Sequence, residues 1–181
     1  GQWARATFGG CDLGDRRRTE RLIKTAACLS RWPAASLTSA CGNQADGLAG
    51  HRLMENDQVD PQAISEGGFA ASVEQASACP VILAASDTTT VAYPHASVLE
   101  QLGDVGGPSA GVKRGYQVHS SLLIDGRDER TLGLVDQHWW KRDPDRRGRK
   151  HRRKDRAYTQ KESYKWERTS RAIARRMGDA M

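Results

Sequence analysis

The segment 81–93 constrains the fold of this chain more than any other part of the sequence. It begins as a continuous apolar run directly after Pro80 and then brings one carboxylate, Asp87, among small hydroxyl residues. A short apolar run of this kind is typical of a buried central strand. Because burying an unpaired charge is costly, Asp87 must there be paired, hydrogen-bonded or bound to a metal. Two interpretations are open: Asp87 caps the turn that follows, or it is a metal ligand.

The residues before this segment carry the signals of an all-helical unit. Asp15 is a good N-cap for a helix that ends at Trp32-Pro33, and residues 3–8 are expected to be a short lead-in. Further helix N-caps are predicted at Ser36, Asn43 and Asp60. The last of them, followed by Pro61, starts a helix over 62–77, in which two adjacent glycines weaken the helical pattern.

From residue 81 onward the pattern changes from helices to strands. Strands are predicted over 115–124 and 131–140, and a tight turn that begins at Asp125-Gly126 joins them. A glycine-rich stretch, 103–115, is expected to be an exposed and mobile loop. Consecutive strands linked in this manner favour one sheet with antiparallel neighbours.

A last helix is predicted over about 160–177. Its packing side is expected to carry residues at helical spacing, namely Trp166, Ser170, Ile173 and Met177. The chain is therefore expected to be an α+β protein, with an all-helical domain over 1–78 and three antiparallel strands and a helix within 79–181. Such a sheet has an uncovered edge, which predicts a tendency to aggregate.

The positive charge of the chain is concentrated in one segment. The formal net charge is +6 and the pI about 9.4. Between residues 141 and 156 there are ten Lys or Arg and three Asp, so this segment carries +7 and the remaining residues together carry −1. A block of this kind favours a polyanion, and nucleic acid fits best. The alternative is a solvated, disordered linker.

A second group of cations crowds the first turns of the helix that Asp15 caps. Its members are Arg16, Arg17, Arg18, Arg21 and Lys24. Positive charge at a helix N-terminus opposes the helix dipole, unless an anion such as a phosphate neutralises it. Ordinary solvation, helped by nearby acidic residues, is the alternative. Farther on, His51, Arg52 and Asn56 offer polar groups that can reach phosphates or base edges.

Several classes of protein are disfavoured by the composition. No apolar run approaches the length of a membrane span, and the start of the chain lacks the pattern of a signal peptide. The four cysteines are scattered without close pairs, which predicts neither a zinc site nor a disulfide framework. A reducing cytoplasm is the expected setting. The chain begins with Gly1 rather than Met, which suggests a fragment or a processed chain.

Five segments carry a resemblance to one family. They are Leu-Gly-Asp-Arg-Arg-Arg-Thr-Glu-Arg-Leu at 13–22, Ser-Asp-Thr-Thr-Thr at 86–90, Val-His-Ser-Ser-Leu-Leu at 118–123, Leu-Gly-Leu-Val-Asp-Gln-His-Trp-Trp at 132–140 and Lys-Glu-Ser-Tyr-Lys-Trp at 161–166. In this order along the chain they resemble the bacterial cut-and-paste transposases of the insertion-sequence-four family. The first matches that family's N-terminal helix, and the others match strands and a helix of its core.

The resemblance implies a DNA-binding domain over 1–78 and a truncated ribonuclease-H-like core over 79–181. It also implies DDE chemistry, in which three carboxylates hold two Mg²⁺ ions (Mn²⁺ is possible) that promote attack on a DNA phosphodiester. Asp87 matches the first of these carboxylates, as a catalytic residue and metal ligand. The second aspartate and the glutamate of the family lie beyond Met181. This chain alone, as a fragment, is therefore expected to be inactive.

The implied partner is double-stranded DNA at transposon ends, with a dimer formed only on DNA in the complete protein. The cations of 16–24 would face this DNA, and His51 and Arg52 stand where the family has a Tyr-Arg pair. One alternative is a non-catalytic regulator that blocks transposon ends. Another is a module for RNA or single-stranded DNA, which the low aromatic content of 6% disfavours.

Overall fold

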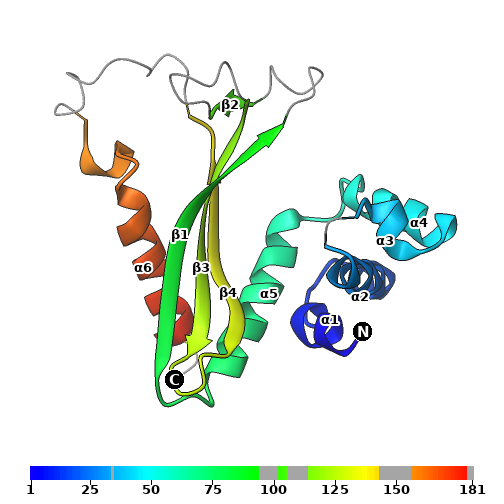
Figure 1. The fold of residues 1–181 in the computed structure, drawn as a ribbon, viewed down its shortest axis with the longest axis horizontal. Helices are drawn as coiled ribbons and strands as arrows, with labels where there is room; N and C mark the ends of the chain where they lie inside the picture. The colour runs from blue at the N-terminus through cyan, green and yellow to red at the C-terminus, as the bar shows by residue number, and fades with distance from the viewer. Residues whose placement is uncertain (34, 94–101, 106–113, 143–155, 179–181) are drawn as a thin grey trace. The chain divides into compact units, whose positions relative to one another are not determined.

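The computed structural model describes residues 1–33, 35–93, 102–105, 114–142 and 156–178, and it divides into two compact units, Gly1–Ala78 and Cys79–Met181. Helices build the first unit, and an antiparallel sheet with a helix builds the second (Figure 1). This arrangement confirms the α+β class. None of the described helices has both the length and the apolar character that a membrane crossing requires.

The helices described in the first unit are α1 (Gln2–Phe8), α2 (Arg16–Arg31), α3 (Leu37–Cys41), α4 (Gln44–Met54) and α5 (Pro61–Ala76). The predicted N-caps all form, because each capping side chain accepts a hydrogen bond from a backbone amide two or three residues further on. These caps are Asp15, Ser36, Asn43 and Asp60. The prediction of a mere lead-in over 3–8 was wrong. This segment is a helix that buries Ala4 completely and packs against α2 and α5.

The core of the first unit gathers side chains from segments far apart in the sequence. The buried cluster consists of Cys11, Leu13, Leu22, Leu53 and Val59. Phe8, Ala63 and Ile64 pack against it. Burial of this apolar surface, at roughly 25 cal/mol per Å², is the main force that holds the short helices together. The core therefore fixes where the polar face of α2 points.

In the second unit, β1 (Ile82–Tyr93), β3 (Arg114–Asp125) and β4 (Thr131–Trp140) form an antiparallel sheet with β3 in the middle (Figure 1). The antiparallel meander was predicted, and the bounds of β4 agree with the prediction. A further two-residue strand, β2 (Gly103–Asp104), pairs with the start of β3, so this part of the expected loop is in fact a strand.

The prediction of a buried central strand at 81–93 was wrong. Among the described strands β1 pairs with β3 alone, so it lies at an edge, and Val81 and Leu83 are each 53% exposed. The central strand is β3, in which His119, Ser121 and Leu123 are fully buried. An apolar run is ambiguous in this respect, because it reports low polarity and not the number of neighbouring strands.

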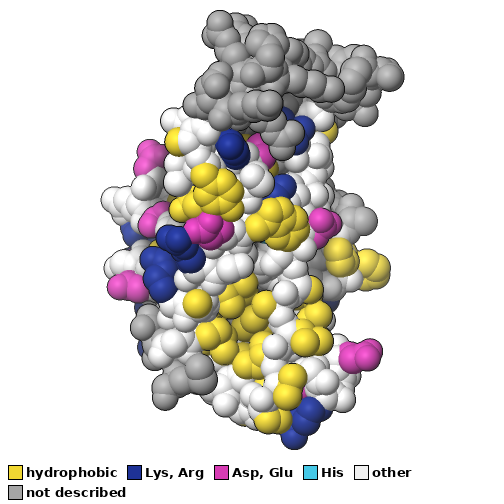
Figure 2. All heavy atoms as spheres, turned by 90° about the vertical axis from the view of Figure 1, so that its left-hand side faces the viewer, with side chains coloured by type: hydrophobic (Ala, Val, Ile, Leu, Met, Phe, Trp, Pro, Cys, Tyr) yellow, Lys and Arg dark blue, Asp and Glu magenta, His cyan; other side chains and the backbone are white. Residues whose placement is uncertain are grey.

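One face of the sheet packs against α6 (Tyr164–Gly178), which a 3-10 turn at Tyr158–Gln160 precedes. The buried side of α6 carries Thr169 and Ala172, whereas Trp166 is 48% exposed and Ser170 is also exposed. The predicted packing side was therefore correct only in part, because Ile173 and Met177 are partly buried and the Trp166 ring meets that of His119, whereas Ser170 is exposed. Seen from the side of α6, hydrophobic side chains gather in the middle of the surface with charged ones at their border (Figure 2).

Two predictions fall on residues that are not described. Most of the glycine-rich stretch 103–115 lies outside the described residues, as does most of the basic block 141–156. Of that block, Lys141, Arg142 and Arg156 are described. Arg142 forms an ion pair with Glu162, with 2.7 Å between Nε and Oε1.

Candidate functional site

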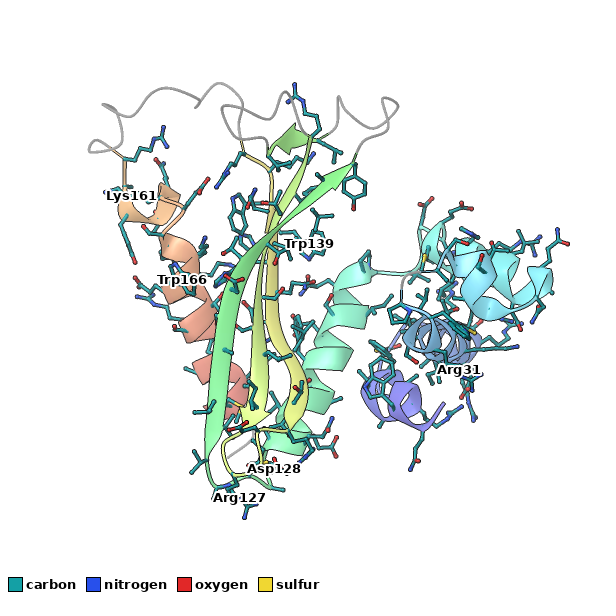
Figure 3. The ribbon with its side chains drawn as sticks, in the orientation of Figure 1. Arg31, Arg127, Asp128, Trp139, Lys161 and Trp166 are labelled. Carbon is teal, nitrogen blue, oxygen red and sulfur yellow. The ribbon has the colours of Figure 1, made fainter. Side chains whose placement is uncertain are left out.

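A basic concavity lies between α1 and α2. Its volume is about 870 Å³. The charged residues that line it are Arg5 from α1 and Arg16, Arg17, Glu20, Arg21 and Lys24 from α2. Five cations thus face one carboxylate, and the amphipathic α2 brings four of them to one side of the unit. The stick view shows the side chains along α2, with Arg31 labelled on this helix (Figure 3). A concavity with this charge suits a phosphate-rich ligand.

At the start of α2, the cations Arg16 and Arg17 are exposed. The side chain of Arg17 is 91% exposed, and its Nη2 lies 2.9 Å from Oδ2 of Asp15. Asp15 also accepts a hydrogen bond from the Arg17 amide at 2.8 Å, and both bonds lower the pKa of Asp15. The carboxylate of Asp15 therefore occupies the helix N-terminus. A phosphate would meet the guanidinium groups of this turn rather than its amides.

Arg21 and Lys24 are joined to α4 through Asp46. Oδ1 of Asp46 lies 3.0 Å from Nη1 of Arg21 and 2.6 Å from Nζ of Lys24. Its Oδ2 accepts a hydrogen bond from Asn43 at 2.8 Å. Lys24, Asn43 and Arg21 together hold the pKa of Asp46 well below its usual range. These two cations therefore stabilise the contact between α2 and α4, although the Lys24 side chain is still 55% exposed.

The side chain of Arg18 is held by hydrogen bonds within the first unit. Its Nη1 donates to the carbonyl oxygen of Leu13 at 3.0 Å and to that of Gln58 at 3.3 Å, and its Nη2 donates to Oε1 of Gln58. These bonds tie the first turn of α2 to the loops on either side of the core. Arg18 does not belong to the lining of the basic concavity. The run of three arginines thus divides into two exposed cations and one that braces the fold.

Arg5 belongs to the same concavity, and the sequence analysis missed it. Its guanidinium forms two hydrogen bonds to Glu20, at 2.9 and 2.6 Å, and these bonds raise the pKa of Arg5. The residue went unnoticed because 3–8 was taken as a lead-in, whereas α1 places Arg5 opposite α2. A sequence signal did exist, because the aromatic residues Trp3 and Phe8 bracket the segment. In the structure their rings meet edge to face at 6.0 Å.

The other predicted DNA contacts lie on α4 and just after it. His51 and Arg52 are exposed in the last turn of α4, where a cation also suits the helix dipole. Asn56 is partly buried, and its Oδ1 accepts a hydrogen bond from the Gln58 amide at 2.9 Å. This bond makes Asn56 part of the turn that leads to the core residue Val59. None of the three lines the basic concavity of α1 and α2.

In the second unit, Asp87 lies in the middle of β1. Its side chain is exposed, and in the sheet register it stands opposite Ser120, which in turn stands opposite Gln137. Because β1 continues to Tyr93, Asp87 does not cap a turn, and that interpretation was wrong. Among the described residues, no group of three or more His, Cys, Asp or Glu is arranged to hold a metal ion.

The other two carboxylates of this region have different environments. Asp136 is in register with Ser121 and Ser86, so its side chain lies on the opposite face of the sheet from that of Asp87. It is buried, and its Oδ2 accepts a hydrogen bond from Thr169 of α6 at 3.1 Å. Asp125, at the end of β3, accepts hydrogen bonds from the Arg127 amide and the Cys79 thiol. Neither can share a ligand with Asp87.

A buried polar cluster lies between α6 and the face of the sheet that carries Asp136. Thr88 Oγ1 and His119 Nδ1 are hydrogen-bonded at 2.9 Å, and the His119 ring meets Trp166 edge to face at 4.6 Å. His138 stacks on Trp140, with 5.5 Å between the ring centroids. Burial and the charge of Lys165 lower the pKa of His119, while burial and Arg168 lower that of His138. The cluster favours neutral histidines under α6.

Comparison with known protein families gives a match within the first unit. Residues 1–59 match the model of a family described as transposase DNA-binding. The matched part covers α1 to α4 and the core residue Val59, and hence all of the residues that line the basic concavity. The match supports a transposase that binds DNA, and it supports DNA as a partner.

Proposed function

We propose that this chain is the DNA-end-binding part, together with the first strands of the catalytic core, of a cut-and-paste transposase from the insertion-sequence-four family, similar to the transposon-five transposase. The observation that carries the proposal is the coincidence of the transposase DNA-binding match with the basic concavity of α1 and α2. The substrate is double-stranded DNA at a transposon end. The complete protein is proposed to dimerise on that DNA.

In this proposal the phosphates of the duplex lie along the α1–α2 concavity. Arg16 and Arg17 make the first contacts, because both are exposed and the ion pair described for Arg17 is with its near neighbour Asp15. Lys24 can turn from Asp46 to a phosphate because its side chain is largely accessible. Arg18 and Arg21 hold α2 in place. His51 and Arg52 on α4 add contacts outside the concavity.

For the second unit we propose the start of a ribonuclease-H-like core, in which Asp87 is the first carboxylate of a DDE site for Mg²⁺ or Mn²⁺. A two-metal site needs several converging carboxylates, since one cannot hold two hard cations. The described residues bring no second carboxylate to Asp87, so by themselves they do not fit such a site. The proposal for this chain is therefore limited to the position of Asp87 on the open face of the sheet.

Duplex binding by this chain tests the proposed function. A labelled terminal-repeat duplex and a scrambled duplex of the same composition are titrated with the chain, and fluorescence anisotropy is followed at several salt concentrations. The proposal expects tighter binding to the terminal repeat at physiological salt and a steep loss of affinity as salt rises. Equal affinity for the two duplexes would contradict end recognition, and a flat salt dependence would contradict a phosphate interface.

The second candidate is a non-catalytic regulator that occupies transposon ends. The observation that favours it is the isolation of Asp87 from other carboxylates in the described part of the sheet. A competition assay tests whether the chain can act in this way. An excess of this chain should block end cleavage by a complete transposase of the same element if it is a regulator, and the Arg16→Ala, Arg17→Ala double variant should not.

A further inference from the structure

Three aromatic side chains form a row across one end of the sheet in the second unit. Tyr93 is the last residue of β1, Tyr116 lies near the start of β3, and Trp139 lies near the end of β4. The ring centroids of Tyr93 and Tyr116 are 6.4 Å apart, and those of Tyr116 and Trp139 are 6.0 Å apart. Both pairs meet edge to face. These three residues, the aromatic row, thus connect three strands that are distant in sequence.

The register of the sheet places the aromatic row on the face opposite to α6. Asp87, Ser120 and Gln137 stand opposite one another on β1, β3 and β4, and they share that face. Each member of the row lies an even number of residues from the one of these three that belongs to its own strand. Because side chains alternate between the two faces of a sheet, the row lies on the same face as Asp87.

The aromatic row is accessible, and hydrogen bonds hold its largest ring. Tyr93 is 40% exposed and Trp139 is 48% exposed, while Tyr116 between them is partly buried. Nε1 of Trp139 donates to Oε1 of Gln137 at 2.8 Å, and Nε2 of Gln137 donates to Oγ of Ser120 at 2.9 Å. The indole is therefore held in place before any ligand arrives, which lowers the entropic cost of binding.

Positive charge accompanies the aromatic row. Lys141 is exposed, and its Nζ lies 5.8 Å from the centroid of the Tyr116 ring. It follows Trp139 closely on the chain and is the first residue of the basic segment 141–156, whose net charge is +7. A partner of this surface must offer flat apolar groups to the rings and negative charge to the lysine. Bases and phosphates together meet both requirements, and a purely apolar protein surface does not.

We propose that the aromatic row and Lys141 form a binding site for the unpaired bases of single-stranded DNA. Bases stack on the exposed rings of Trp139 and Tyr93 whatever their sequence, and Lys141 meets a phosphate. Aromatic side chains on adjacent strands of one sheet face are an established way to hold successive unstacked bases. The match that supports DNA as a partner of this chain selects DNA as the polyanion. The site lies outside the basic concavity and is additional to the duplex binding proposed for the first unit.

The aromatic content of the chain gave no sign of this site. Aromatic residues make up only 6% of the sequence, which disfavoured a module for single strands. A fraction of the whole chain does not report where its members gather, and three of them share one end of one face of the sheet. Their spacing in the sequence conceals this, because β1, β3 and β4 bring them together only through the strand register.

Two oligonucleotides of equal length, oligothymidine and an abasic strand, separate base stacking from charge because their phosphates are the same. Both are titrated with the full chain, and fluorescence anisotropy is followed. Oligothymidine should bind more tightly, by about 5- to 150-fold for one stacked base. Trp139→Ala should remove most of this difference, and Trp139→Phe should keep most of it. Trp32→Ala is the matched control, because Trp32 is a 64% exposed tryptophan of the first unit, and it should change nothing. Equal affinity of the unchanged chain for the two strands would overturn the proposal.

Photochemical crosslinking locates the bases without any substitution in the sheet, so it does not depend on how Trp139→Ala folds. An oligonucleotide of 5-iododeoxyuridine is irradiated with the full chain, and the linked peptides are identified by mass spectrometry. Links are expected in the aromatic row, and links confined to Trp3 or Trp32 would overturn the proposal. Sedimentation equilibrium tests the other occupant of this face. A dimer of the unchanged chain that Trp139→Ala converts to monomer would assign the row to a second copy and would also overturn the proposal.

One double variant separates this site from the proposed function. Arg16→Ala, Arg17→Ala should lose affinity for the terminal-repeat duplex and should still prefer oligothymidine to the abasic strand. Loss of that preference in the double variant would place the bases on the first unit and would overturn the proposal. Equal affinity of the unchanged chain for terminal-repeat and scrambled duplexes contradicts end recognition alone, because the comparison of the two single strands does not involve the terminal repeat.

Discussion

Nζ of Lys24 lies 2.6 Å from Oδ1 of Asp46, the same oxygen that Arg21 approaches at 3.0 Å. One carboxylate of α4 thus receives two cations of α2, both of which line the basic concavity. Asp46 stands where a phosphate oxygen would be expected to meet these cations. The relationship links the stability of the helical unit to the proposed DNA contact, because Lys24 would have to leave Asp46 in order to meet a phosphate.

The first prediction concerns the stability of the first unit at acid pH. Its three partners hold the pKa of Asp46 far below the usual aspartate value of 3.8. The folded state therefore binds this proton less readily than the unfolded state, and the stabilisation is present above about pH 4 and is lost as the pH falls further. We expect the urea midpoint, followed by circular dichroism, to fall below pH 4. Asp46→Asn should be less stable at pH 7 and should lose part of this acid dependence. An unchanged acid profile in Asp46→Asn would contradict the assignment.

The second prediction separates neighbouring arginines of α2. Arg17→Ala should lower the magnitude of the salt slope of duplex binding by about 1, because one phosphate contact is lost, with little change in stability. Arg18→Ala should leave the slope unchanged but destabilise the unit, because the carbonyl groups of Leu13 and Gln58 lose their donor. Anisotropy titrations across a salt series and urea denaturation measure the two quantities. The opposite pattern would reverse the roles of the two residues.

The third prediction uses two adjacent glycines of α5. A Cβ at Gly68 would make ordinary contact with the Phe8 ring at 3.6 Å, so Gly68→Ala should stabilise the protein by about 0.5–1 kcal/mol through helix propensity. A Cβ at Gly67 would collide with Sγ of Cys11 and lie 3.2 Å from its Cα. Gly67→Ala should therefore destabilise the protein by about 1–3 kcal/mol. Urea denaturation measures the free energy of unfolding of both variants. Similar values for the two would contradict the prediction and would show that the core adjusts around Cys11.

The glycine pair also shows how far the sequence could predict this fold. Caps and turn residues act locally, so Asp15, Ser36, Asn43 and Asp60 predicted helix starts that the structure confirms. Gly67 weakened the sequence prediction of α5. A glycine is needed at this position because a Cβ would collide with Cys11, which is distant in sequence. The edge position of β1 and the helical state of α1 likewise depend on tertiary neighbours. A propensity pattern does not contain that information.

The candidate site was predictable to a similar degree. The crowding of cations on α2 is visible in the sequence, but their partners are not. Only the fold shows that Arg18 binds carbonyl groups, that Arg21 and Lys24 share Asp46, and that Arg5 joins the concavity from α1.

The fourth prediction compares two aspartates of the sheet. Asp87 is exposed, so Asp87→Asn should leave the stability of this chain within about 0.5 kcal/mol. Asp136 is buried and accepts a hydrogen bond from Thr169, so Asp136→Asn should destabilise by about 1–3 kcal/mol. In a complete transposase, Asp87→Asn should abolish end cleavage while duplex binding is retained. A loss of folding in Asp87→Asn would assign that side chain a structural role instead.

The fifth prediction concerns the stability of the second unit at mildly acid pH. The folded pKa of His119 and that of His138 lie below the ordinary value of 6.5, so the unfolded state binds more protons below that pH. The stability of the second unit should be complete above pH 6.5 and decrease as the pH falls toward the folded pKa values. His119→Gln should lose part of this slope and keep the part due to His138. Trp166 fluorescence offers a local probe, because its ring touches His119.

The alternation of side chains along β1 has a consequence for any complete catalytic centre. Ser86 and Thr88 are bonded to Ser121 and His119 on the face that α6 covers, and Asp87 between them faces the other way. In the proposed DDE site, a second carboxylate would therefore have to approach Asp87 from the face of the sheet opposite to α6. A slip of β1 by one residue against β3 would exchange the two faces. The two hydroxyl contacts that flank Asp87 thus fix the face of the sheet on which the proposed metal site would have to form.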